Sequence, residues 1–76
     1  MTDKELATKM AEYGIYGAGQ DRTPEQQRWG ADCVEVSARL MELSDIRSIT
    51  IIQWEYTIES LREKAVSMRE LADTLT

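Results

Sequence analysis

The last third of the chain carries an apolar pattern that strongly restricts its fold. From Ile51 onwards, apolar residues recur at alternating spacings of three and four, which is the period of one face of an α-helix. Thr50, just before the pattern, and Gln53 match a capping box, a common helix start. The pattern predicts a helix over residues 51–75. Its apolar face comprises Ile51, Trp54, Ile58, Leu61, Ala65, Met68, Ala72 and Leu75.

The beginning of this segment also fits a β-strand. Apolar and polar residues alternate there, as in a half-buried strand. The apolar members of this alternation are Ile52, Trp54, Tyr56 and Ile58. We favour the helix because its register persists to the end of the chain, whereas a single strand would have no pairing partner. The state of residues 50–58 stays open at this point.

A second helix is predicted over residues 24–43. Thr23 is a good N-cap, Pro24 suits the first turn and Gln26 completes a capping box. Apolar residues then alternate at spacings of four and three, which predicts a heptad-like seam in the core. This seam comprises Trp29, Cys33, Val36, Leu40 and Leu43.

A shorter helix is predicted over residues 3–13. Thr2 and Glu5 match a capping box, and Gly14 is expected to end the helix. The residues after the helix, 14–22, contain three glycines and predict a connector. The apolar positions of the helix are Leu6, Met10 and Tyr13, with Ala7 and Ala11 beside them.

These elements predict a single all-α domain over residues 1–76, in which a short N-terminal helix and a glycine-rich connector precede a long antiparallel helical hairpin. A domain this small usually needs a disulfide, a metal or oligomerisation to support its core. Cys33 is the only cysteine and histidine is absent, which excludes an intrachain disulfide and the common zinc sites. We therefore expect no metal or cofactor, and a homodimer that completes the bundle through the region of Trp54 and Tyr56.

The charge balance excludes further functions. The chain has 9 basic and 14 acidic residues and a net charge of -5, and its basic residues are scattered, so direct binding to nucleic acid is not expected. The longest apolar run, at residues 51–52, is far too short to span a membrane, and a signal peptide is not expected. The sequence thus predicts a cytoplasmic protein. Without histidine, histidine-based triads are impossible, and no enzymatic activity is predicted.

The leading hypothesis is a small acidic protein-binding module that regulates or inhibits a larger protein. Tyrosine and tryptophan are favoured at interfaces because they combine an apolar ring with a polar group. For Trp29 and Trp54, a core position is the main expectation, since each lies on its helix seam. Apolar partner contacts are predicted at Tyr16, Trp29, Ile52, Trp54 and Tyr56. A charged rim, spaced as an i, i+4 row on a helix, is predicted at Glu55, Glu59 and Glu63.

Resemblances support this hypothesis and leave others open. In size, acidity and predicted helical character, the chain is similar to phage- or mobile-element-encoded modulators of host enzymes. Asp32-x-x-Glu35 and Glu70-x-x-Asp73 resemble the paired acids of all-α nucleotide pyrophosphatases of the MazG type, which implies a hydrolase that holds Mg²⁺ on these carboxylates. The glutamate row would alternatively mimic the phosphates of a nucleic acid and block a basic groove. A structural subunit of a larger assembly would show the same interface features.

Overall fold

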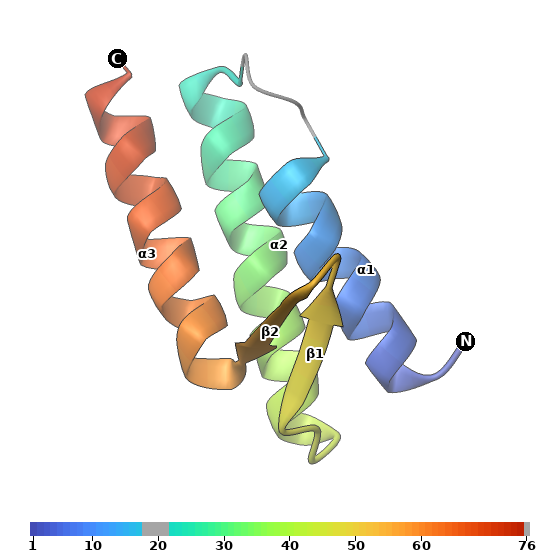
Figure 1. Cartoon of the computed structure of the whole chain (residues 1–76). Coiled ribbons are helices and arrows are strands. Elements are labelled where there is room, and N and C mark those ends of the chain that lie inside the picture. The colour runs from blue at the N-terminus through green and yellow to red at the C-terminus, as the bar shows by residue number, and fades with distance from the viewer. Residues whose placement is uncertain (18–21, 76) are drawn as a thin grey trace.

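A computed structural model describes residues 1–17 and 22–75, which form a mainly helical domain (Figure 1). In chain order its elements are α1 (Asp3–Tyr16), α2 (Pro24–Leu43), β1 (Ser48–Ile51), β2 (Trp54–Thr57) and α3 (Ile58–Thr74). The predicted helical class is confirmed. The all-α description is wrong, because an antiparallel β-hairpin separates α2 from α3. Residues 18–21 of the predicted connector lie outside the described residues.

Helix α1 begins as predicted and ends later than predicted. The Thr2 hydroxyl accepts a hydrogen bond from the backbone N–H of Glu5 at 3.1 Å. The helix then continues through Gly14 to Tyr16, so the predicted end is wrong. Gly14 is buried where α1 crosses α2, and a Cβ atom there would lie 2.5 Å from the carbonyl oxygen of Gly30. This glycine therefore permits close helix packing and does not end the helix.

Helix α2 spans the predicted residues and is held at both ends by hydrogen bonds. At its start, Thr23 and Gln26 form the predicted capping box, with hydrogen bonds of 3.1 and 2.9 Å. At its end, the backbone N–H of Ile46 donates to the carbonyl of Met41 at 2.8 Å, and Asp45 has a φ of 56°. This is a Schellman arrangement, in which an aspartate takes the place that glycine usually fills.

Helix α2 lies between α1 and α3 and packs against both (Figure 1). Because α2 contacts a helix on each side, its buried face is broad. Most residues of this face are small, which lets both neighbouring helices approach closely. The buried residues are Gln27, Gly30, Ala31, Val34, Ser37, Ala38 and Met41. The predicted core seam is wrong at Trp29, Val36 and Leu43, which are 50%, 51% and 70% exposed. Leu40 is partly buried and packs against the core, and Cys33 is partly buried.

Helix α1, like α2, buries small residues and exposes larger apolar ones. Its buried residues are Ala7, Ala11 and Gly14. The larger Leu6 and Tyr13 are exposed. Two hydrogen bonds join α1 to the antiparallel α2. In the middle of α1, the Ser37 hydroxyl donates to the carbonyl of Ala7 at 2.6 Å. At the start of α1, the hydroxyl of Ser44, the residue after α2, donates to the Asp3 carboxylate at 2.8 Å.

The β-hairpin replaces the beginning of the predicted C-terminal helix. Strands β1 and β2 pair antiparallel, with Ile49 opposite Tyr56 and Ile51 opposite Trp54. Ile49 and Ile51 are buried and anchor the hairpin on the helical core. The strand alternative is thus right for β2, and its pairing partner is the segment that directly precedes the turn.

Helix α3 begins at Ile58, where the chain leaves the hairpin. Thr57 and Ser60 form its capping box, with hydrogen bonds of 3.1 and 2.7 Å. The predicted capping box of Thr50 and Gln53 is wrong, because these residues belong to the hairpin. Beyond this point the predicted apolar face is confirmed at Leu61, Ala65, Met68 and Ala72, all of which are buried.

The interior of the domain is built largely from alanine. The buried alanines are Ala7, Ala11, Ala31, Ala38, Ala65 and Ala72. Small side chains let the helices approach closely, but they bury little apolar area per residue. Several much larger apolar side chains lie on the surface. None of the described helices combines the length and the apolar character needed to cross a membrane.

Candidate functional site

The tip of the β-hairpin exposes two large apolar side chains. Ile52 is 75% exposed and Trp54 is 59% exposed. Ile52 is the first residue of the two-residue turn between the strands and has a φ of 62°. Positive φ at this position is usual in hairpin turns, but the residue that adopts it is normally glycine, asparagine or aspartate. The chain thus has a β-branched apolar residue where neither burial nor backbone preference favours one.

The backbone of Ile52 is strained, because its φ is positive. A left-handed conformation costs an L-residue about 1–2 kcal/mol, and for a β-branched residue it is a genuine outlier. The folded chain leaves this side chain mostly in water, so burial offsets little of that cost. Strained residues of this kind gather at ligand clamps and switch regions. The hairpin tip is therefore the first candidate for a contact with another molecule.

Two of the predicted contact residues, Tyr16 and Tyr56, meet each other. Tyr56 of β2 is partly buried against the core. Burial, and then hydrogen bonding with the Tyr16 side chain at the end of α1, raises the pKa of Tyr56. Tyr56 therefore packs within its own chain and is not a free contact residue.

The three glutamates of the predicted charged rim do not form one helical row. Glu55 belongs to β2, whereas Glu59 and Glu63 lie near the start of α3. All three are exposed. Because side chains alternate between the two faces of a strand, Glu55 points away from the face that carries Trp54 and Tyr56. Only Glu59 and Glu63 keep the predicted helical spacing.

Trp29, the remaining predicted contact residue, lies on an outer face shared by α1 and α2. Its ring packs edge-to-face on that of Tyr13, with centroids 5.1 Å apart and planes at 88°. Helix geometry places the large apolar residues of both predicted seams on this side. We call this surface the α1/α2 apolar face; it comprises Leu6, Met10, Tyr13, Trp29, Cys33, Val36, Leu40 and Leu43. Sequence periodicity groups these residues, but it predicts them inside the domain.

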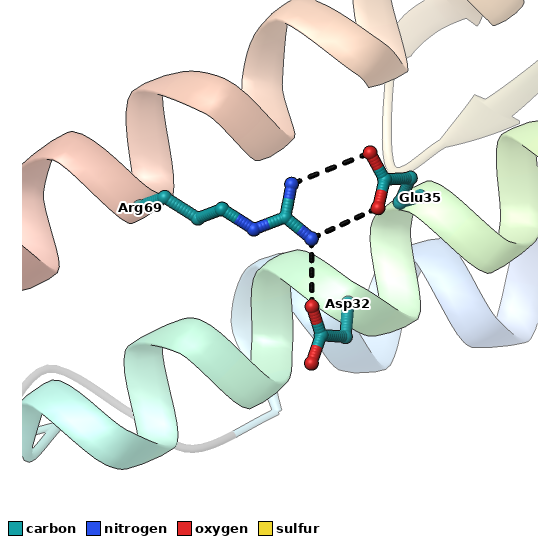
Figure 2. Close-up of polar contacts among 3 residues, drawn as sticks. All are labelled: Asp32, Glu35 and Arg69. Atoms are coloured by element: carbon teal, nitrogen blue, oxygen red, sulfur yellow. Dashed lines mark hydrogen bonds and ion pairs between the residues drawn. The ribbon is translucent and has the colours of Figure 1, made fainter.

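The acids Asp32 and Glu35 are already paired with a cation of the chain itself (Figure 2). The Arg69 guanidinium on α3 lies 2.6 Å from Asp32 and 2.9 and 3.3 Å from the two oxygens of Glu35. The hydrogen bonds with Glu35 and Asp32 raise the pKa of Arg69. Asp73, from the second predicted acid pair, contacts Arg28 at 3.2 Å. Within residues 1–17 and 22–75, no group of three or more potential ligands is placed to hold a metal ion.

A further ion-pair cluster lies near the C-terminal end of α2. Glu42 accepts hydrogen bonds from Arg39 at 2.6 Å and from Arg62 of α3 at 3.3 Å. These two hydrogen bonds, the one from Arg39 first, lower the pKa of Glu42. The cluster was not predicted, because the residues of α2 and α3 that meet are known only once the crossing of the helices is known.

Comparison with protein-family models, with curated proteins and with solved structures finds no match for this chain. The candidate surfaces therefore rest on geometry. They are the hairpin tip and the α1/α2 apolar face.

Proposed function

We propose that this chain is a small protein-binding module that regulates or inhibits a larger protein, and that it works as a homodimer in which a second copy completes the helical bundle. The observation that carries the proposal is Ile52, an exposed β-branched residue at positive φ beside the exposed Trp54. A partner that buries both side chains would supply the apolar burial that the folded chain does not provide.

The chemistry of the hairpin region supports a protein partner. A tryptophan that enters a pocket is among the commonest interface hot spots. In the same part of the chain, Glu55 of β2 and Glu59 and Glu63 of α3 are exposed acids, and the chain has a net charge of -5. We therefore expect the partner to offer an apolar pocket and basic residues near it. Reversing the charge of the three glutamates should weaken this contact, and the loss should shrink in high salt, because salt screens exposed charges.

The test separates binding from folding by relieving the strain at the hairpin tip. Ile52→Gly removes both the apolar side chain and its backbone strain, so the free energy of unfolding should rise, by up to about 1 kcal/mol. Urea unfolding measures this change. Partner binding should fall in the same variant. We expect Trp54→Ala to weaken binding as well.

Binding is measured by affinity capture from cell extract, followed by titration of each captured protein with purified variants. Val66→Ala is the matched control, because Val66 is 53% exposed on α3. Proteins retained by the wild type and by the control, and lost with both hairpin variants, would support the proposal. If both hairpin variants retained the same proteins as the wild type, the hairpin would not be the binding surface.

A further inference from the structure

We infer that two copies of this chain associate through the α1/α2 apolar face, with their α2 helices antiparallel about a two-fold axis. This inference rests on the homodimer of the proposed function and assigns its contact surface. The sequence predicted that surface around Trp54 and Tyr56, but Tyr56 is partly buried and packs against the core of its own chain.

The α1/α2 apolar face is large enough for a dimer contact. An aromatic side chain can bury about 150–250 Å²; at half exposure, Tyr13 and Trp29 together offer on the order of 200 Å². Leu6, Val36 and Leu43 are 41%, 51% and 70% exposed and extend this area. The largest apolar patch of a typical monomer is roughly 300–600 Å². A standard interface buries about 800 Å² on each partner, and about 65% of a homodimer interface is apolar. The apolar area needed on each copy is therefore of the same order as such a patch.

The spacing of the apolar residues on this face of α2 suits packing against another helix. Trp29, Val36 and Leu43 are exposed, whereas Cys33 and Leu40 are partly buried and Leu40 also packs against the core of its own chain. Trp29, Cys33, Val36, Leu40 and Leu43 alternate at spacings of four and three. This is the seam of a helix pair in which each apolar side chain enters a hole on the facing helix. In heptad terms, Trp29, Val36 and Leu43 take the d position, and Cys33 and Leu40 take the a position. The residues that pack against α1, including Gly30 and Ser37, take the e position.

The charges beside this seam select one register. Asp32 and Arg39 both occupy the g position and have opposite charges. In an antiparallel pair, g positions of the two helices face each other, and such charges set partner orientation. When Cys33 packs against Val36 of the other copy, Asp32 of each copy lies beside Arg39 of the other. The two-fold axis makes this ion pair twice.

Other arrangements of the same seam are less favourable. Shifting the antiparallel register by one layer in one direction brings the two Arg39 side chains together. A shift in the other direction brings the two Asp32 side chains together. In a parallel pair, g positions face e positions, where uncharged Gly30 and Ser37 offer no ion-pair partner. Charge complementarity therefore points to a second copy of this chain in the antiparallel register.

Asp32 and Arg39 remain accessible for this contact. Their side chains are 65% and 64% exposed in the single chain. Each already has a neighbour of opposite charge within the chain: Arg69 contacts Asp32, and Glu42 contacts Arg39. A guanidinium has five N–H donors and a carboxylate accepts several hydrogen bonds, so both groups can add a partner without losing the one they have.

The test uses mixed variants. Arg39→Glu places Glu beside Asp32 of the other copy, and Asp32→Lys places Lys beside Arg39. We expect each variant alone to raise the dimer dissociation constant at least about tenfold, because two like-charge contacts replace two ion pairs. An equimolar mixture should restore dimers, since the mixed pair regains opposite charges at both contacts. Native mass spectrometry distinguishes the mixed dimer from each homodimer, and circular dichroism checks the fold of each variant.

A second pair of variants tests the apolar contact. Val36→Glu places a charge in the seam at a residue that is exposed in the single chain, so the fold should be retained. Val66→Glu is its matched control, because Val66 has nearly the same exposure and lies outside the α1/α2 apolar face. Light scattering across a concentration series should show twice the 8.7 kDa chain mass for the wild type and the control. Val36→Glu should remain at the mass of one chain.

The outcomes separate the surface from the proposed function. A wild-type dimer that persists in Val36→Glu, or variants that form no mixed dimer, would overturn this interface while leaving the homodimer intact. A wild type with the mass of one chain up to millimolar concentration would overturn both the homodimer and this interface. Neither result bears on the hairpin contact, which the Ile52 variants test separately.

Discussion

At Gly30 the backbone of α2 lies against α1 with no room for a side chain. A Cβ atom there would lie 2.6 Å from the carbonyl oxygen of Gly14 and 3.1 Å from the methyl carbon of Met68. Alanine normally stabilises a helix interior relative to glycine, by roughly 0.5–1 kcal/mol. Here it would push α1 and α2 apart. We predict that Gly30→Ala lowers the free energy of unfolding by about 1–3 kcal/mol, measured by urea unfolding.

A substitution to alanine at an exposed helical position serves as the control. Ser67→Ala on α3 replaces an exposed side chain, so its effect should stay within about 0.5 kcal/mol. A Gly30→Ala protein as stable as the wild type would show that α1 and α2 can move apart at little cost.

At the scale of the elements, the caps of α1 and α2 were readable from the sequence, whereas the hairpin and the cap of α3 were not. Thr2 and Thr23 mark helix starts by local hydrogen bonds that any reader of the sequence can anticipate. The hairpin turn at residues 52–53 lacks glycine, asparagine or aspartate, which are the usual signals. Trp54 satisfies the helical and the strand period alike. Only the pairing with Ser48–Ile51, which the sequence pattern does not reveal, decides between helix and strand.

The faces of α1 and α2 could be grouped from the sequence but not assigned to core or surface. Periodicity identifies one stripe of large apolar residues and another of small ones on each helix. Which stripe is buried depends on how closely the neighbouring helices approach, and the Gly14–Gly30 crossing brings α1 and α2 close together. Alanine and glycine fit that spacing, whereas Trp29 and Tyr13 do not. The candidate contact residue Trp29 was therefore predicted chiefly as core and found on the surface.

The contact between α1 and β2 predicts a loss of stability in alkali. Burial and the hydrogen bond with Tyr16 raise the pKa of Tyr56. The unfolded chain thus releases this proton first, near the ordinary tyrosine pKa of about 10. The contribution of Tyr56 is complete below that pH and is lost as pH rises through the pKa of the folded state. Urea unfolding near neutral pH and above the ordinary pKa measures the loss.

Tyr56→Phe removes this titration while keeping the ring. The variant should be less stable near neutral pH, because the hydrogen bond with Tyr16 is gone, and it should lose less additional stability in alkali than the wild type. An equal alkaline loss in both proteins would show that other groups cause it.

For the whole molecule, the inferred dimer predicts that Cys33 reacts more slowly as protein concentration rises. Burial, with a smaller contribution from Asp32, raises the pKa of this thiol in the single chain, and the thiolate is the reactive form. In the dimer the side chain packs against Val36 of the other copy and is covered further. Reaction with a disulfide reagent, followed by absorbance, measures the rate. In Val36→Glu the rate should not change with concentration.

The alanine-rich interior has a thermal consequence for such a dimer. The heat capacity change of unfolding follows the apolar area that becomes exposed, and alanine exposes little. The inferred contact between copies would contain tryptophan, tyrosine and leucine side chains, so its stability would depend chiefly on apolar burial. Apolar burial weakens on cooling. Chilling should therefore separate the copies while each chain stays folded, making assembly cold-labile even though the fold is not.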